Sequence, residues 1–572
     1  MADDSTDAPT TTGTEVLVVG AGPVGLTTAH ELARRGVAVR VIDGAPGPAT
    51  TSRALAVHAR TLEIIDQMNV LDLLLPQGRK VEHFTLHLRG RTLIRFDTDY
   101  SDMPTRYPFS LMVDQVVTEK VLRDRLATLG VTVEWGVRLD SFTPHENQVD
   151  VRLATPDGPA ALSVPWLVGA DGAHSTVRKN LGLHLTGDTT ETWLNADVEL
   201  DIDLPGDSNH LLHTGSGTLL LVPFPESGKW RVVDTQDTGD ADDPEAVRAR
   251  LEAKVARALG RPATVSAPTW ISVFTVQQRM IDKMRVGRCF VAGDAAHIHS
   301  PASGQGMNTG IQDAYNLAWK LADVVRGHAT EALLDSYSAE RVPVGARLLR
   351  STRTATALVA LRNAVGPVLL PVALRLVNSI APLKHRIERK MIRSFCGLTV
   401  EYASSPLSLR AAAPSGTEPA RRGPQPGQRV SAAASSKDAS EDEGLRGLHE
   451  ELRDPRWTLL VAADPCPAQT TELLDHVDRR YGTAVSVRTV RDLVDDRGGP
   501  NQLPDPHGTL RRELGIEAGG FALIRPDGHL AGKGPLSGRH GLLHTLGGLG
   551  MEPTDEAPAM VPDQEQTSVP RQ

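Results

Sequence analysis

A short glycine-rich segment near the N-terminus, GAGPVG, constrains the fold of this 572-residue chain more than any other stretch. Its glycines, Gly20, Gly22 and Gly25, follow the apolar run EVLVV and precede a run with helical character, PVGLTTAHELARRG. A second apolar run, VAVRVID, ends in Asp43. Strand, helix and strand in this order predict a βαβ unit on a parallel sheet, and therefore an α/β fold.

This arrangement is typical of dinucleotide binding. The first glycine permits a tight turn, the second lets the backbone approach a pyrophosphate, and the third lets the helix pack closely. Pro23 begins the helix, whose N-terminus directs partial positive charge at the phosphates. Asp43 stands where a carboxylate takes the ribose hydroxyls. We therefore expect all five residues to contact the cofactor, although this fingerprint alone does not distinguish FAD from NAD.

Composition argues against several other classes of partner. A formal net charge of -9, from 61 basic and 70 acidic residues, provides no basic face for nucleic acid. The most apolar stretch, residues 357–383, is interrupted by arginines and prolines, so we expect no membrane role. The three cysteines, Cys289, Cys396 and Cys466, form no CxxC pair, and the N-terminus lacks a secretory signal. These features indicate a cytoplasmic enzyme.

Two further motifs narrow the choice of cofactor. LVGADGAHSTVR contains Asp171 and Gly172, and GRCFVAGDAAHIHSPASGQGMN contains Gly293 and Asp294. With the glycine fingerprint, and in this order, they resemble the class A flavoprotein monooxygenases, the group of para-hydroxybenzoate hydroxylase and phenol hydroxylase. The resemblance covers residues 15–402, with a looser match over the C-terminal part.

The resemblance implies how the second motif meets FAD. Asp294 is expected at the ribityl chain or ribose of the cofactor. The glycine-rich turn that follows is expected to lay backbone amides near the flavin ring, where the start of a helix favours an electron-rich edge. The residues of this turn that we assign to the cofactor are Gly304, Gly306, Met307 and Asn308.

Other cofactor residues are implied in the same way. Asp171 matches a motif linked to the FAD pyrophosphate and to the pyridine nucleotide, but it could instead cap the next turn and pair with Arg178. Arg53 matches a family residue that lies near the flavin and follows the cofactor as it moves between buried and solvent-facing positions. It is our candidate for a role in flavin movement and reduction. Gln115 matches a glutamine that touches the cofactor. Arg60 is more simply a surface ion pair.

His297 and His299 lie two residues apart beside the second motif. A shared metal is one interpretation, but no further cluster of histidine or cysteine ligands stands near them in the sequence. An acid–base role is a second interpretation, because histidine titrates in the working range. We favour a third, in which they hold the turn by hydrogen bonds, and we expect no metal.

Parallel and antiparallel patterns alternate along the chain, which implies interleaved domains. We expect a Rossmann-like FAD-binding domain interleaved with an antiparallel-sheet substrate domain, then a helical region and a C-terminal α/β domain that resembles thioredoxin. The expected boundaries are 14–80, 108–185 and 285–350 for the FAD-binding domain, 81–107 and 186–284 for the substrate domain, 351–409 for the helical region, 410–444 for a linker, 445–550 for the thioredoxin-like domain, and 1–13 and 551–572 for disordered tails. Since Cys466 lacks a CxxC partner, disulfide exchange is not expected.

The resemblance also implies the reaction. NADPH, or alternatively NADH, reduces FAD, O2 forms a flavin hydroperoxide, and one oxygen atom passes to an electron-rich aromatic ring. The segments GDAAHIHSPASGQGMNTGIQDAYNLAWKL and LIRPDGH are similar to those of bacterial hydroxylases that tailor aromatic polyketides. We therefore expect a polycyclic aromatic substrate and a role in antibiotic biosynthesis. Alternatives on the same fold are Baeyer–Villiger oxidation, epoxidation, or a protein that shelters an unstable intermediate. A homodimer is a further expectation.

No catalytic base can be assigned from the sequence. The strand-like run GTLLLVPF suits the floor of an apolar cavity, so Val222 and Phe224 are substrate candidates, with Pro301 from the second motif. Three more residues lie on predicted strands of the substrate domain but are more simply packed or exposed: His213, Trp230 and Gln278.

Overall fold

The computed structural model describes residues 13–300 and 304–360 apart from positions 89, 98–102, 215–216, 237 and 240, and then residues 396–409, 423–431, 442–462, 467–492 and 501–536. Isolated described positions are 379, 380, 382, 386, 546, 547, 549 and 551. Pro301, Cys466, the expected tails and most of the expected linker lie outside the described residues. No helix within the described ranges is both long and apolar enough to cross a membrane.

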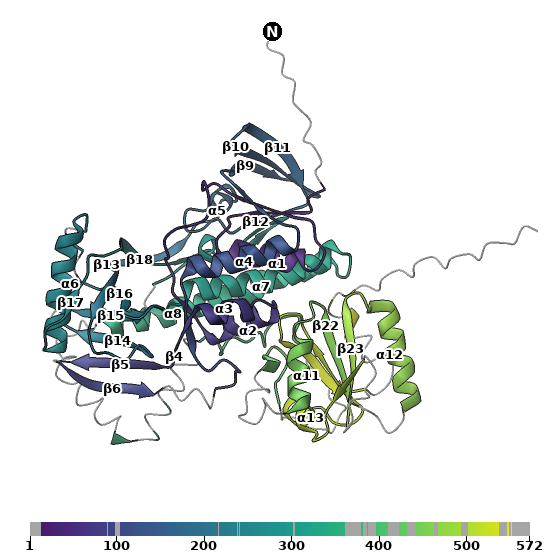
Figure 1. Ribbon diagram of the computed structural model, residues 1–572. Coiled ribbons are helices and arrows are strands. Elements are labelled where there is room, and N and C mark those ends of the chain that lie inside the picture. Colours follow the sequence, from purple (N-terminus) through teal and green to yellow (C-terminus); the bar gives the residue numbers. More distant parts are fainter. Residues whose placement is uncertain are drawn as a thin grey trace, which may run out of the picture.

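A six-stranded, mainly parallel sheet forms the centre of the molecule and confirms the predicted βαβ unit (Figure 1). The order of its strands is β19 (Arg285–Val286), β20 (Cys289–Val291), β12 (Trp166–Gly169), β1 (Val16–Val19), β2 (Val39–Asp43) and β8 (Val133–Trp135). Every residue of β1 is buried, as expected for a strand covered on both faces. The last strand, β19, runs antiparallel to β20.

Three long helices pack side by side against this sheet (Figure 1). They are α1 (Pro23–Ala33), α4 (Gln115–Thr128) and α7 (Gly306–Val325). A Cβ atom on Gly25 would lie 1.8 Å from the carbonyl oxygen of Gly20, so only glycine lets α1 start this close to the strand. The helix that carries the fingerprint is thus fixed against the loop that precedes it.

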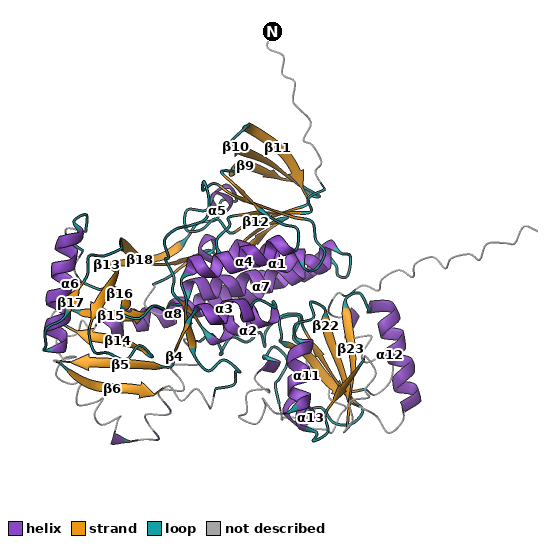
Figure 2. Ribbon diagram, in the orientation of Figure 1, coloured by secondary structure: helices purple, strands orange, loops and turns teal. Residues whose placement is uncertain are grey.

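A nine-stranded sheet lies to one side of the centre (Figure 2). Along its main path the strands are β21 (His297–Ile298), β18 (Trp270–Met280), β13 (Thr186–Asp201), β16 (Lys229–Asp234), β15 (Thr218–Pro223), β14 (Ser208–His213), β5 (His83–Leu88) and β6 (Arg91–Asp97), while β17 (Thr264–Val265) pairs with β13. In GTLLLVPFPESGKWRVVDTQDT two strand-like runs flank a Pro-Glu-Ser-Gly turn, which predicts an antiparallel pair, and this hairpin is present as β15 and β16. One face is covered by α6 (Pro244–Leu259).

Two small sheets and several short helices complete the N-terminal part. The strands are β9 (Arg138–Pro144), β10 (Val149–Thr155) and β11 (Gly158–Val164) in one sheet, and β3 (Ala56–Val57), β7 (Ser110–Met112) and β4 (Arg79–Val81) in the other. The helices that matter below are α2 (Ala59–Gln67), α5 (Thr176–Asn180), the 3₁₀ turn η3 (Gly293–Ala295) and the long α8 (Asp335–Ala360).

The C-terminal part contains five strands, whereas the apolar runs WTLLVAAD, AVSVRTV and GGFALIRPDGHLAG predict three. They are β24 (Gln502–Pro504), β23 (Val485–Arg491), β22 (Trp457–Ala462), β25 (Gly520–Ile524) and β26 (Leu530–Pro535), flanked by α11 (Glu443–Glu451), α12 (Pro467–Tyr481) and α13 (Thr509–Leu514). GGFALIRPDGHLAG is not one strand but two, because the Pro-Asp-Gly turn folds β26 back on β25. The likeness to thioredoxin remains a prediction.

Buried ion pairs attach this C-terminal sheet to the centre. The Arg525 guanidinium donates to both carboxylate oxygens of Glu340 in α8, at 2.7 and 2.9 Å. Lys320 in α7 donates to the same carboxylate at 2.8 Å. Trp319 packs edge-on against Trp457 at 5.3 Å between ring centroids. All five side chains are buried, so the two parts share one continuous interior.

Candidate cofactor and substrate site

The three motifs predicted to bind the cofactor meet at one edge of the central sheet. The fingerprint loop follows β1, Asp171 follows β12 and Gly293 follows β20, and these three strands are parallel neighbours. The carboxyl ends of parallel strands lie at a common edge, which is where open α/β sheets bind their ligands. The structure therefore brings together three motifs that span more than half of the chain.

The fingerprint loop has the shape that a pyrophosphate requires. A Cβ atom on Gly20, whose φ is +106°, would lie 2.3 Å from the carbonyl oxygen of Ala170. At Gly22, by contrast, no atom lies within 4 Å of the position its Cβ would take. Gly22 also begins α1 without a side-chain cap, so the first backbone amides of the helix are available to an anion.

Asp43 closes this loop at the end of β2. Its carboxylate accepts hydrogen bonds from the backbone N–H of Ala21 at 2.7 Å and of Ala45 at 2.8 Å. An ionised carboxylate has about four lone-pair sites, so capacity remains for ribose hydroxyls. Asp43 is only half-buried, as a group that meets a ligand must be.

Asp171 caps α5, which confirms the structural part of its interpretation. Its carboxylate accepts from the hydroxyl of Ser175 at 2.5 Å and from the backbone N–H groups of Thr176 and Val177 at 2.6 and 3.1 Å. The alternative of a hydrogen-bonded pair with Arg178 is not present, because that buried guanidinium donates to the carbonyl oxygen of Ala295 at 3.2 Å. Arg178 thereby ties the motif that contains Asp171 to the motif that contains Gly293 and Asp294.

Gln115 holds the segment that carries Arg53. The Gln115 side-chain oxygen accepts from the N–H of Ala54 at 3.0 Å, and its own backbone N–H donates to the hydroxyl of Ser52 at 2.7 Å. Its amide nitrogen donates to Glu119 at 2.8 Å. The Arg53 side chain between these anchors is exposed. Gln115 thus acts on the loop through hydrogen bonds, whether or not it also touches the cofactor.

A buried pair on the nine-stranded sheet supports the same segment. Arg231 donates to both carboxylate oxygens of Asp197, at 2.8 and 2.9 Å. Its remaining donors reach the carbonyl oxygens of Ser52 at 2.8 Å and Arg53 at 3.0 Å. No motif marks Arg231 or Asp197 in the sequence, and only the pairing of β13 with β16 places them opposite each other.

Asp294 and Arg53 face a common electrostatic environment. Asp294 is exposed in η3, yet the protein mass around it raises the pKa of its carboxyl by desolvation, against the opposing charges of His297 and Arg53. Burial likewise raises the pKa of Glu119, on which the charges of Asp43 and Arg53 also act. Acidic and basic groups from separate segments therefore act on one another at this edge of the sheet.

The glycine-rich turn leads into α7 without a side-chain cap. Gly304 has a φ of +61°, and Gly306 begins the helix. The side chain of Asn308 is fully engaged: its oxygen accepts from the N–H of His58 at 2.8 Å, and its nitrogen donates to the carbonyl oxygens of Ala56 and Gly304, both at 2.8 Å. The turn is thus held rigid while its uncapped amides stay available, as a flavin edge would require.

His297 holds the turn as we expected. Its Nε2 bonds Asp313 at 2.7 Å, and the same carboxylate accepts from the N–H of Gly293 at 3.1 Å and from Arg341 at 2.6 Å. Burial alone would lower the pKa of His297, but Asp313 outweighs it and raises that pKa. His299 differs: burial and the neighbouring His297 lower its pKa to about 4, so it is neutral at pH 7.

No metal centre is visible in this part of the chain. Within the ranges that the structure describes, no three His, Cys, Asp or Glu side chains come together in a way that could hold an ion. The Nε2 atom of His297 is instead bonded to Asp313.

The substrate candidates fall on different surfaces. Val222 is half-buried on the face of the nine-stranded sheet opposite α6, among Trp193, Leu211 and Leu220. Phe224 is buried beneath the cations of Lys229 and Arg231, so it serves packing in the described structure.

The other three candidate residues on this sheet lie on three different strands. Trp230 belongs to the core beneath α6, Gln278 is buried on β18, and His213 ends β14. Arg60 is also structural rather than exposed: it is buried, pairs with Glu63 at 2.9 Å and donates to the carbonyl oxygen of Asp527 at 2.9 Å.

Comparison with known protein families agrees with this geometry. A model of the FAD binding domain family matches residues 13–352, which contain all three motifs. The chain belongs to this family. It is also 60% identical over 550 residues to 6-methylpretetramide 4-monooxygenase of Streptomyces rimosus, a match that covers 96% of each protein. The prediction of an FAD-dependent monooxygenase acting on aromatic compounds is thereby confirmed.

Solved structures show the same architecture. A ternary complex of aklavinone-11 hydroxylase with FAD and aklavinone superimposes with a TM-score of 0.71 at 26% identity, covering 94% of this chain and 98% of the other. The Diels-Alderase of pyrroindomycin biosynthesis superimposes with a TM-score of 0.64 at 25% identity, covering 94% and 100%. The predicted α/β fold, with a Rossmann-like part and an antiparallel sheet, is confirmed.

Proposed function

We propose that this protein uses NADPH or NADH, together with O2, to hydroxylate a polycyclic aromatic compound of the pretetramide type. The observation that carries the proposal is the 60% identity to 6-methylpretetramide 4-monooxygenase along nearly the whole of both chains. An apolar surface of matching character supports it. On the nine-stranded sheet, the face opposite α6 carries Phe84, Val222 and Phe274, which are partly exposed, over the buried Leu86, Trp193, Leu211 and Leu220.

The chain's own residues position and shield the reaction. FAD, when bound, supplies the activation of O2 that closed-shell aromatics require. The uncapped amides of α1 and α7 receive its negatively charged groups, and Asp43 and Asp294 receive hydroxyls. Arg53, which is exposed and held by Gln115 and Arg231, supplies a positive charge at the cofactor site. The apolar sheet face excludes water from the substrate.

The sheltering role remains the second candidate, because one observation favours it. A protein with this architecture and 25% identity is named a Diels-Alderase, so the fold also serves a reaction without net oxidation. Both roles predict a bound flavin and a bound polycycle. They differ in whether the polycycle accelerates flavin reduction by the nicotinamide.

The deciding experiment mixes the anaerobic yellow protein with NADPH or NADH, with and without tetracyclic phenols, and follows loss of flavin absorbance. We expect one phenol to accelerate bleaching, one nicotinamide to be preferred, and the aerobic product to gain one oxygen on an aromatic carbon. Product connectivity, determined by NMR, separates hydroxylation from ring insertion and epoxidation. If dithionite bleaches the flavin but neither nicotinamide does, with any phenol that binds, the sheltering role replaces the hydroxylase.

A further inference from the structure

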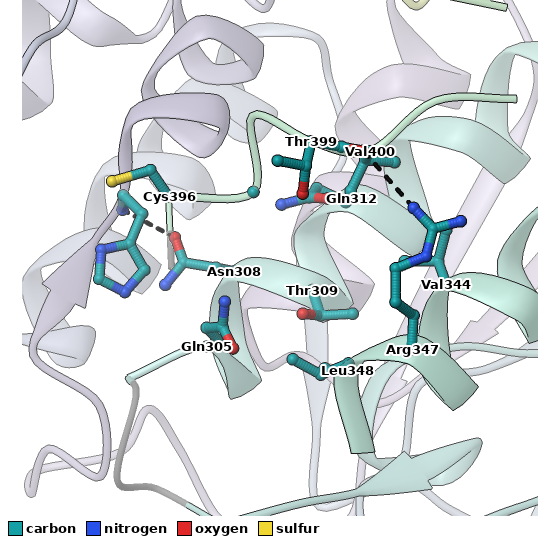
Figure 3. A pocket seen from close by; sticks show the side chains of 12 residues that line it. Gln305, Asn308, Thr309, Gln312, Val344, Arg347, Leu348, Cys396, Thr399 and Val400 are labelled. Carbon is teal, nitrogen blue, oxygen red and sulfur yellow. Dashed lines mark hydrogen bonds between the residues drawn. The ribbon is translucent and has the colours of Figure 1, made fainter. Parts of the chain in front are cut away.

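A pocket adjoins the glycine-rich turn at the N-terminus of α7. It is open to solvent and has a cavity volume of about 60 Å³ between α7, α8 and residues 396–400 (Figure 3). Two of its lining residues, Gln305 and Asn308, belong to the turn itself. A molecule in this pocket would therefore lie beside the cofactor site.

The α7 wall of the pocket presents polar groups that lack partners. Gln312 is 8% exposed and Thr309 is 6% exposed. Neither the Gln312 amide nor the Thr309 hydroxyl forms a side-chain hydrogen bond with a described residue, and Figure 3 shows both beside the open space. The polar atoms of both side chains are accessible at the pocket and bond no described residue, so they can bond a ligand that enters it.

The α8 wall supplies a positive charge. Arg347 is exposed at the pocket, and its only described hydrogen bond is a long contact of 3.5 Å to the carbonyl oxygen of Thr399. No carboxylate of the described residues pairs with it. Arg341, two turns earlier on the same helix, differs: it is buried and satisfied by Asp313 and Tyr402. The Arg347 guanidinium thus retains donors for a ligand.

Apolar side chains complete the pocket. Val344 and Leu348 from α8 are nearly fully buried, and Val400 lies across from α7. This combination and the small volume suit the acidic edge of a ring system: an arginine fork and an amide take the oxygens inside the pocket, while the apolar residues contact the adjoining carbon atoms.

We propose that this pocket binds the acidic, oxygen-rich edge of the polycyclic substrate, an enolate or carboxylate attached to the ring system, with Arg347, Gln312 and Thr309 as its polar contacts. The proposal rests on the proposed function and adds the means by which one end of the substrate is recognised. A free small organic acid has the same chemistry. The shared Gln305 and Asn308 favour the substrate, because they place the pocket next to the flavin turn.

Binding of an anthraquinone pair tests the proposal. The ligands are a dihydroxyanthraquinone carboxylic acid and its methyl ester, titrated into the holoenzyme by quenching of flavin fluorescence. Arg347→Gln should weaken binding of the acid about tenfold or more and change binding of the ester less than about twofold, since only the acid carries the charge. Arg350→Gln, an exposed arginine one turn further along α8 that does not line the pocket, is the matched control and should change neither.

Gln312→Leu separates ligand binding from a structural role. If the amide serves the ligand, this nearly isosteric change weakens binding of both anthraquinones while the Tm stays level, because the amide bonds no described residue in the protein itself. A fall in Tm with unchanged affinities overturns the role of Gln312. Unchanged affinity of Arg347→Gln for the acid overturns the pocket as a whole.

Salicylate distinguishes the two sources of the same chemistry. We expect it to compete with the anthraquinone acid and to lose affinity in Arg347→Gln. If it binds through Arg347 without competing, the pocket serves a free small acid and the substrate assignment falls. The proposed function fails in a different way: wild-type protein would then show no acceleration of flavin reduction by any phenol, whatever the variants bind.

Discussion

The cofactor site and the seam beneath the C-terminal sheet, which is formed by Glu340, Arg525 and Lys320, contain the same residue types but use them differently. At the seam, Glu340 and Arg525 are fully buried, and every carboxylate oxygen has a cationic partner. At the cofactor site, Asp294 and Arg53 are exposed and interact by long-range electrostatic attraction without a direct ion pair. Charged groups that are satisfied internally hold the molecule together, whereas groups left unsatisfied are available to a ligand.

The largest effect should come from breaking the seam. Glu340→Gln removes the negative charge that faces Arg525 and Lys320. It leaves the buried Lys320 without a carboxylate partner and Arg525 with Asp527 alone, which costs about 3–5 kcal/mol. Urea unfolding measures it. The exposed pair of Lys120 and Asp124 is the control, since Lys120→Ala should cost less than about 1 kcal/mol. Equal effects of the two changes would show that burial of the pair is irrelevant.

Asp294→Asn should give the opposite result. Stability of the apoprotein should change by less than about 0.5 kcal/mol, because the carboxylate is exposed. Affinity for FAD should fall by about 1.5–3 kcal/mol through loss of a charged acceptor. The ratio of flavin to protein absorbance after gel filtration measures it. Since the pKa of Asp294 is raised, wild-type affinity for FAD should also fall as pH drops through that pKa, and the variant should lack this dependence.

Arg231→Lys tests the link between the two sheets. The lysine keeps the charge opposite Asp197 but loses the planar fork that also holds the carbonyl oxygens of Ser52 and Arg53. We expect about tenfold slower flavin reduction, close to 1.4 kcal/mol, with FAD still bound. Stopped-flow absorbance measures the rate. A normal rate would mean that the position of Arg53 does not depend on this sheet.

The smallest effect is a change of slope with pH. Burial alone would raise the pKa of Glu63, but Arg429 and Arg60 lower it to about 2, below the ordinary value of 4.5. The stability from this group is present above pH 4.5 and is lost as pH falls from there toward 2. The free energy of unfolding of Glu63→Gln should therefore depend less on pH in that window than that of the wild type. An unchanged slope would remove Glu63 from the acid response.

Local pattern predicted the elements well where a segment's own residues determine its shape. The fingerprint loop, the hairpin between β15 and β16, and the capping by Asp171 all depend on residues close in sequence. Contacts between distant segments were predicted less well. One alternative paired Arg178 with Asp171, but Arg178 bonds Ala295, 117 positions away, and Arg60 was expected at the surface but lies under the C-terminal sheet.

The sequence by itself therefore determined that the chain binds a dinucleotide, because a phosphate cradle needs glycines at fixed spacing in one short loop. The choice of FAD and the chemistry came from the resemblance that the two further motifs carry. Only the tertiary structure decided which charged side chains form ion pairs within the protein and which remain available to a ligand. Arg231 and Arg347 look alike in the sequence, yet strand pairing places Asp197 opposite the first, and the packing of α8 leaves the second beside an open pocket. Desolvation and hydrogen-bond satisfaction depend on neighbours from every part of the chain, and no local pattern encodes them.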